Sequence, residues 1–326
     1  DQSDNENASM NVDIYLQKTK ILTLTDYVIS QYTGTQGENG LYYHDSSLTN
    51  GAGDNSYRYA GASESVNNFV CFGSTTNPCP TDNLYRIIGV FENKVKLIKY
   101  DYATSALLGT DGEYSNSYTP DSTYYKGSLT SINVYYWNYK NNTSINNGRG
   151  SNEWSTSLLN KINLNTNYLN NIGTTWSNMI EDATWKVSGH TTGDVTPSEM
   201  YTREITNATK TYGPSDGTSK IGLMYVSDYG FAASPSAWTK TLYNYSGADA
   251  NGTSIRTINW MYMGYSEWTI SPRSSNSFIV YSLYYKGRVD TNNSSYGSRP
   301  VLYLKSSTIY AGGSGTKDLP ITLVVW

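Results

Sequence analysis

The sequence predicts an α+β fold in which antiparallel strands dominate and a few short helices are joined by long loops. Two apolar, β-branched segments flank a tight Glu92-Asn93 turn, a pattern typical of a β-hairpin over residues 84–100. A helical spacing of apolar residues appears over residues 151–171. Many short strands with few helices fit an antiparallel sheet better than any other layered arrangement.

The first elements are short. Residues 1–11 are polar and predict a loose segment, and a helix is expected from Leu24 to Gln31, ending before Gly34. Residues 37–59 are rich in glycine and predict turns and short strands. In the second strand of the hairpin, lysines interrupt both faces, at Lys94 and Lys96 on one and at Lys99 on the other. We therefore expect one side of the hairpin to be only partly covered.

The longest helical pattern places Trp154, Leu158 and Ile162 at positions i, i+4 and i+8 after a Ser/Asn cap. We expect these residues to face the sheet that contains residues 87–91, and Leu158→Ala to cost about 2–5 kcal/mol. Another helix is expected at 197–204. The remaining elements are expected to be strands at 185–187, 220–226, 278–285 and 299–304, then a turn and edge strand over 309–326.

No proline- and glycine-rich linker divides residues 84–304. The expected organisation is an N-terminal helical or loose segment (1–35), a glycine-rich cap clipped by a disulfide (36–82), a core (83–305) and a C-terminal edge strand (306–326). Residues 36–326 are expected to form one compact unit.

The aromatic composition is skewed, with 32 Tyr against 5 Phe. Tyrosine buries apolar area while its hydroxyl stays hydrated, so it suits the half-covered face of a thin sheet. It is also a common residue of adaptable recognition surfaces. The sequence leaves both interpretations open. A net charge of −4 without a basic stripe argues against nucleic acid as a partner.

Two cysteines, Cys71 and Cys79, bracket a short loop that contains Gly73 and Pro78. We expect a local disulfide, which indicates an oxidising compartment. No apolar run of transmembrane length occurs, and the polar start at Asp1 looks like that of a processed or trimmed chain. An extracellular or cell-surface location follows as the expectation.

Several segments carry a family resemblance, above all Trp268-x-x-Ser-Pro-Arg273 and Arg299-Pro-Val-Leu302, together with Asn83–Gly89. They resemble an uncharacterised family of secreted and surface proteins of gut Firmicutes. That family is distantly similar to the C-type-lectin and formylglycine-generating-enzyme fold. The resemblance implies a C-type-lectin-like core over residues 83–305, with the binding face in the long loops before the closing strands.

The residues give little support to catalysis. His44 and His190 lie in polar segments without a nucleophile motif, and no cysteine follows Cys79 to support formylglycine-type chemistry. Asp228 and Glu267 are the carboxylates in the most apolar contexts, so they are the candidates for a glycoside hydrolase. Arg299 and Trp268, beside core strands, are interpreted as structural. We therefore expect no enzyme activity.

No cofactor is predicted. Calcium needs several oxygen ligands in a tight loop. Two groups are loose candidates for it: Asp45, Asp54 and Asn55, and Asp249 with Asn251.

The sequence favours a non-catalytic, adhesin-like binding protein. Aromatic residues are dense in the loops over 238–265, and we expect six of them to contact the ligand: Trp238, Tyr243, Tyr245, Trp260, Tyr262 and Tyr265. The alternative is that these rings form a core for the loops. The ligand would be a glycan, a host or bacterial surface protein, or another copy of the chain. A structural subunit of a surface filament or coat is the second expectation, and a glycoside hydrolase the third.

Overall fold

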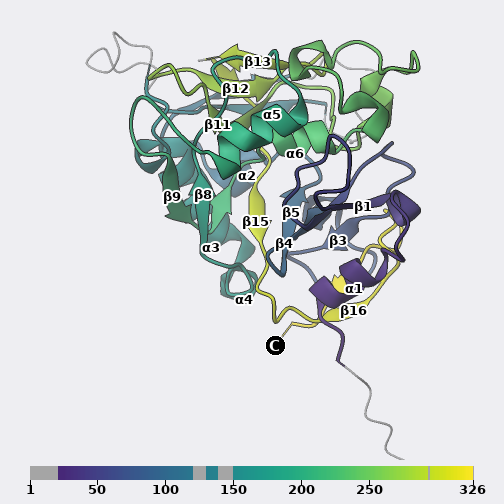
Figure 1. Cartoon of the computed structure of the whole chain (residues 1–326). Helices are drawn as coiled ribbons and strands as arrows, with labels where there is room; N and C mark the ends of the chain where they lie inside the picture. The colour runs from purple at the N-terminus through teal and green to yellow at the C-terminus, as the bar shows by residue number, and fades with distance from the viewer. Residues whose placement is uncertain (1–20, 120–129, 139–149, 293, 326) are drawn as a thin grey trace, which may run out of the picture.

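The computed structural model describes residues 21–119, 130–138, 150–292 and 294–325, so most of the predicted N-terminal segment lies outside the described residues (Figure 1). The described chain is an α+β protein whose largest sheet has seven antiparallel strands. Six of them follow the order β1-β2-β4-β5-β15-β10, and β3 pairs with β4 beside β2. Their bounds are β1 Leu41–His44, β2 Ser56–Tyr59, β3 Phe69–Cys71, β4 Leu84–Phe91, β5 Lys94–Lys99, β10 Ile221–Gly222 and β15 Val301–Tyr303.

The centre of this sheet is the predicted hairpin. Strands β4 and β5 meet at the pair Phe91–Lys94, around a turn in which Glu92 and Asn93 have φ of 47° and 64°. Two consecutive positive φ values match the right-handed twist of the paired strands. The closing strand β15 pairs with β5 through Val301 and Leu302. The hairpin and the position of the closing strand are therefore confirmed.

Lys94, at the turn end of β5, is partly exposed, as expected for one partly covered side, but Lys96 and Lys99 are buried. Lys96 and Lys99 are each about 1% exposed. The pattern misled because a lysine normally marks a solvated face. Here the Lys96 ammonium is buried against the carboxylate of Asp228.

The segment predicted as a cap contributes three strands to the main sheet. Strands β1 and β2 pair along their whole length, and β3 adds to β4. Two short 3-10 turns, η1 (Glu38–Gly40) and η2 (Thr81–Asn83), join them to the rest of the chain. Residues 36–82 are thus part of the same layer as the hairpin.

Helix α1 (Leu24–Ser30) confirms the first predicted helix. It begins where the Thr23 hydroxyl accepts a hydrogen bond from the Asp26 N–H at 3.0 Å, a side-chain N-cap. Its residues Leu24 and Val28 are buried against the hairpin.

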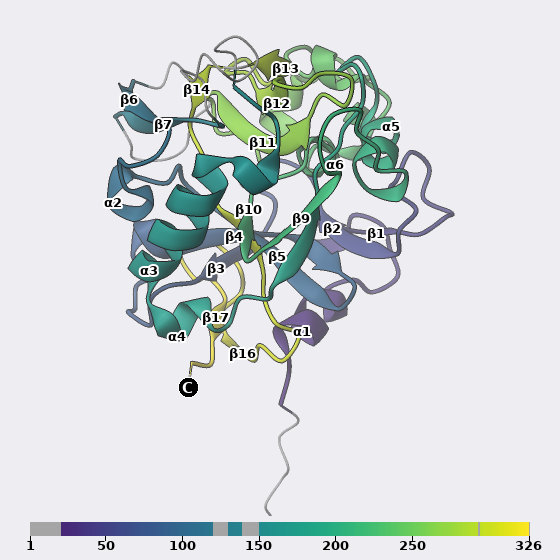
Figure 2. The same cartoon turned by 90° about the vertical axis from the view of Figure 1, so that its left-hand side faces the viewer.

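A second group of helices covers one side of the molecule (Figure 2). It comprises α2 (Ser105–Leu108), η4 (Trp154–Thr156), η5 (Leu159–Tyr168), α3 (Leu169–Ile172) and α4 (Thr174–Ser177). Because η5 is a π-helix, its wider turns bury Leu159 and Leu164, five residues apart. Leu158 and Ile162 are only partly buried and lie beside Gly112. The predicted inward face was therefore wrong for these two residues.

The remaining elements surround the main sheet. They form the sheets β11 (Glu267–Pro272), β12 (Val280–Leu283) and β13 (Val289–Asn292); β6 (Tyr114–Tyr118), β7 (Ile132–Tyr136) and β14 (Ser295–Tyr296); β8 (Ala183–Lys186) with β9 (Asp216–Ser219); and β16 (Tyr310–Gly312) with β17 (Thr322–Leu323). Three more 3-10 turns, η7 (Pro235–Ala237), η8 (Leu242–Asn244) and η9 (Ile255–Ile258), lie in the loop-rich region.

Helices α5 (Pro197–Tyr201), continued by η6 (Thr202–Thr206), and α6 (Val226–Phe231) lie between the β11–β13 sheet and the main sheet (Figure 1). Helix α5 confirms the prediction for residues 197–204. The strand predicted over 220–226 is limited to Ile221–Gly222, and Val226 begins α6 instead. The helix forms because the Glu204 carboxylate accepts the N–H groups of Val226 and Ser227, which a helix leaves unpaired at its start.

Candidate functional site

Five of the six aromatic residues expected to bind a ligand are buried: Trp238, Tyr245, Trp260, Tyr262 and Tyr265, none of them more than 9% exposed. Their polar atoms are used inside the protein. The Tyr245 hydroxyl, for example, lies 3.1 Å from the Gly230 carbonyl oxygen, and the Trp260 indole N–H donates to the Tyr59 carbonyl. A ring without an exposed face cannot stack on a sugar. The alternative of a loop core describes these five residues.

Tyr243 is the exception, with 46% of its surface exposed. Its ring lies 5.1 Å from the Arg288 guanidinium. The six residues are thus divided between interior and surface and do not form one aromatic face.

A pocket of about 400 Å³ lies where β2, β4 and β5 meet α5 and α6. Its walls combine aromatic rings with charged groups of both signs. The aromatic part comes from Phe91, Tyr201, Tyr225 and Tyr303. The charged part comes from Asp54, Arg58, Glu92, Lys94, Lys96, Asp182, Lys186 and Asp228.

Buried ion pairs form the floor of this pocket. The Lys96 Nζ lies 2.5 Å from Asp228 Oδ2, and both side chains are at most 2% exposed. The Arg58 guanidinium lies 2.5 Å from Asp54 Oδ2 and 3.6 Å from Asp228 Oδ1. Asp228 Oδ2 also accepts the Tyr225 N–H at the start of α6. The floor therefore ties β2 and β5 to α6 through charges.

Aromatic rings enclose the two cations of the floor. The Lys96 Nζ lies 4.4 Å from the ring centroid of Tyr225 and 5.5 Å from that of Tyr303. The Arg58 guanidinium lies 4.6 Å from the Phe91 centroid. Cation–π attraction at these distances offsets part of the loss of hydration.

Burial and neighbouring charge move the pKa values of this cluster. Burial alone would raise the pKa of Asp54, but the Arg58 guanidinium and the Ser56 hydrogen bonds outweigh it and lower that pKa to about 2. Burial also lowers the pKa of Lys96, with Asp228 opposing the change. Glu204 is 0% exposed at the start of α6, and burial raises the pKa of its carboxyl to about 7. Glu204 is thus close to half-protonated at neutral pH.

The carboxylates considered for hydrolysis are both engaged in ion pairs. Glu267 receives two hydrogen bonds from Arg299, each 2.7 Å long, and both side chains are 1% exposed. Arg299 also donates to the Met261 carbonyl. This geometry agrees with the structural role expected for Arg299. Asp228, by contrast, lines the pocket.

The two histidines have different surroundings. His44 is fully buried next to Phe231 and Trp238, and its Nδ1 accepts the Ala52 N–H at 3.0 Å. Burial holds the pKa of His44 well below its usual range. His190 lines a smaller pocket of about 290 Å³.

The carboxylates proposed as loose calcium ligands are used in turns and ion pairs. Asp45 accepts the N–H groups of Ser47 and Leu48, and Asp249 accepts those of Asn251 and Thr253. Among the described residues, no group of three His, Cys, Asp or Glu side chains could hold a metal ion.

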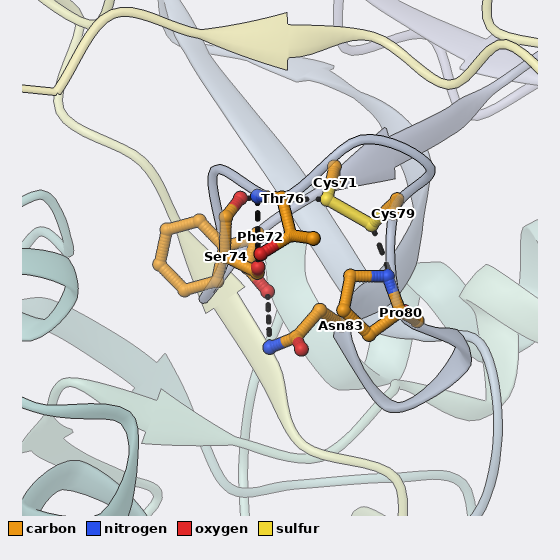
Figure 3. Close-up of a disulfide and its surroundings, with 7 residues drawn as sticks. All are labelled: Cys71, Phe72, Ser74, Thr76, Cys79, Pro80 and Asn83. Carbon is orange, nitrogen blue, oxygen red and sulfur yellow. Dashed lines mark hydrogen bonds between the residues drawn. A yellow bond between two sulfur atoms is a disulfide. The ribbon is translucent and has the colours of Figure 1, made fainter.

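Cys71 and Cys79 form the predicted disulfide, with Cα atoms 5.8 Å apart (Figure 3). The loop between them returns to the sheet, where the Asn83 side-chain amide donates to the Phe72 carbonyl. A disulfide is compatible with an extracellular protein. Among the helices in the described part of the chain, none is sufficiently long and apolar to span a membrane.

No protein-family model, no curated protein and no solved structure matches this chain. The C-type-lectin-like topology and the likeness to secreted proteins of gut Firmicutes therefore stay predictions. The class of the protein is set by its fold: an α+β, strand-rich chain with a local disulfide.

Sequence reasoning missed the pocket but not all of its residues. The sequence indicates Asp228, a carboxylate in an apolar context, and Lys96, a charge that interrupts a strand. Nothing in the local pattern distinguishes Arg58 within Ser-Tyr-Arg-Tyr59. The useful signal was a cation inside an apolar strand, because such a charge requires a buried partner.

Proposed function

We propose that the protein is a non-catalytic, extracellular binding protein and that its ligand is an uncharged glycan held in the pocket over Arg58 and Lys96. The main observation in support of this proposal is a cavity of about 400 Å³ whose walls combine aromatic rings with equal numbers of positive and negative groups. Ligand pockets usually enclose about 300–1,000 Å³. The pocket replaces the aromatic loops as the expected binding face.

The charge balance selects the ligand class. The pocket is lined by four cations and four carboxylates: Arg58, Lys94, Lys96 and Lys186 against Asp54, Glu92, Asp182 and Asp228. An anionic ligand would require an excess of cations, and an apolar ligand would leave the charges without hydrogen-bonding partners. Sugar hydroxyls both donate and accept hydrogen bonds, so they suit carboxylates and ammonium groups together.

Two other functions have less support. For a filament or coat subunit, the edge strand β1 is the expected point of strand addition. The Gln36 side chain, however, already accepts the Tyr43 N–H at 2.9 Å and donates to the Tyr43 carbonyl at 2.8 Å. For a hydrolase, Glu267 is fully engaged by Arg299.

A glycan array with the purified protein tests the proposal. The matched variants are Asp182→Ala combined with Lys186→Ala at the pocket rim, and Tyr243→Ala on the exposed loop. We expect the rim variant to lose at least about tenfold in affinity, roughly one hydrogen bond, and Tyr243→Ala to bind as the wild type does. Absence of glycan binding, or loss confined to Tyr243→Ala, would refute the pocket as the binding site.

A further inference from the structure

The contact between Lys96 and Asp228 joins two distant parts of the chain. Lys96 lies in the central strand β5, and Asp228 lies in the first turn of α6, 132 residues later. The 2.5 Å between Nζ and Oδ2 is short for an ammonium–carboxylate hydrogen bond. Both groups are almost completely removed from solvent.

The Arg299–Glu267 pair shows what a fully compensated buried ion pair looks like in the same protein. There, a planar guanidinium satisfies both carboxylate oxygens and donates to a carbonyl as well. The Lys96 ammonium is a point charge in a cage of aromatic rings, and it donates a hydrogen bond to Asp228. Burying two charges in this way is costly.

A third buried carboxyl, that of Glu204, lies at the start of α6, the helix that carries Asp228. Its oxygens accept the N–H groups of Val226 and Ser227, at 2.9 and 3.0 Å, and the Ser271 hydroxyl donates to it as well. Its charge interacts with both Lys96 and Asp228. Glu204 therefore positions the first turn of α6, which carries Asp228.

We propose that Lys96 and Asp228 condense to form an intramolecular isopeptide bond. The Lys96 Nζ attacks Cγ of Asp228, a nitrogen–carbon bond forms, and one carbon–oxygen bond of the carboxyl breaks. The ammonium loses two protons, which leave with the departing oxygen as one water molecule. No oxidant, reductant or cofactor is consumed, and the two buried charges are replaced by a neutral amide.

The surroundings suit both the reaction and its product. Burial lowers the pKa of Lys96, which favours the neutral, nucleophilic amine. The pocket opens above the pair and gives the released water a route to solvent. The oxygen that remains on Asp228 can still accept the Tyr225 N–H. The bond would fasten the central strand to α6 whether or not a ligand is bound.

Intact mass spectrometry of the denatured, disulfide-reduced protein tests the inference. We expect a mass lower than the sequence mass by one water molecule. Proteolysis should then yield a branched peptide in which the segment around Lys96 is joined to the segment around Asp228. A wild-type protein at its full sequence mass would overturn the proposal.

Two variants identify the groups involved. Lys96→Arg should keep its full sequence mass, because it lacks the amine that forms the bond. Asp228→Asn should release ammonia instead of water and reach the same final mass as the wild type. Loss of water from Lys96→Arg would place the reaction elsewhere and refute the bond. The wild-type and Asp228→Asn masses decide the question even where a variant fails to fold.

Discussion

The aromatic loops over 238–265 and the pocket over Arg58 both bring many aromatic rings together, but they use the rings differently. In the loops, ring hydroxyls and indole N–H groups contact backbone carbonyls, as at Tyr245 and Trp260, and the rings other than Tyr243 are buried. In the pocket, the rings enclose charged groups and leave a cavity of about 400 Å³. A high density of aromatic residues therefore does not by itself indicate a binding face. Aromatic rings that line a cavity and surround buried charges are the better indication of a functional site.

The largest expected effect tests whether the loops are core. Tyr245→Ala should lower the free energy of unfolding by about 3–5 kcal/mol, because it removes a fully buried ring and its hydrogen bonds. Urea unfolding followed by tryptophan fluorescence measures the change. A loss below about 1 kcal/mol, the typical size for a point substitution, would show that the ring is not held in the interior.

The second effect arises at Glu204, which is buried beside the first turn of α6 next to the pocket, and it depends on pH. The folded protein keeps a proton on Glu204 up to about pH 7, whereas the unfolded chain loses it near 4.5. Because the folded state binds more protons in this window, its stability falls as the pH rises from 4.5 to 7, by about 3 kcal/mol in total.

Unfolding titrations between pH 5 and pH 8 measure this fall. Glu204→Gln is the matched control, since its amide does not titrate and the decline should largely disappear. The two proteins are compared by how their free energies of unfolding change with pH. Glu204→Gln also loses one accepted hydrogen bond, but that cost is the same at every pH and does not affect the comparison. A wild-type stability that stays flat across this range would contradict the assignment.

Local patterns predicted much of the fold. The hairpin over 84–100, the helix at 24–30 and the closing strand at 301–303 each follow from a few neighbouring residues and their turn or cap. The inward face of the helix after Trp154 could not be predicted in this way, because no local pattern indicates a π-helix, whose wider turns change which residues point inward. The extension of the sheet by β1–β3 rests on pairing between segments far apart, which no local pattern encodes.

The pocket could be predicted only in part, for the same reason. Arg58, Lys96 and Asp228 come from three segments, and nothing near any one of them names its partners. A tyrosine is equally ambiguous in sequence, because its hydroxyl is satisfied by water at a surface and by a carbonyl in a core. Tyr243 and Tyr245, two residues apart, illustrate both outcomes.

A smaller effect separates the contribution of the Tyr245 hydroxyl to stability from that of its ring. Tyr245→Phe keeps the ring and removes the donor that lies 3.1 Å from the Gly230 carbonyl and 3.3 Å from that of Ala237. We expect a loss of about 1–2 kcal/mol, because the change leaves a buried acceptor without this partner. Thermal and urea unfolding measure it against Tyr245→Ala. Equal losses for the two variants would mean that the hydroxyl, and not the packing of the ring, carries the stability.

The smallest effect on stability is expected at Tyr243, the exposed tyrosine two residues before the buried Tyr245. Its ring is 46% exposed and contacts the Arg288 guanidinium at the surface, where a cation–π contact contributes little. Tyr243→Ala should therefore change the free energy of unfolding by no more than about 0.5 kcal/mol, the range of ordinary surface substitutions. The same urea titration, run beside Tyr245→Ala, measures the contrast between two tyrosines of one loop. If Tyr243→Ala lost as much free energy of unfolding as Tyr245→Ala, both tyrosines would contribute equally to the stability of the loop. The exposure of a ring would then not distinguish the core of the loop from its surface.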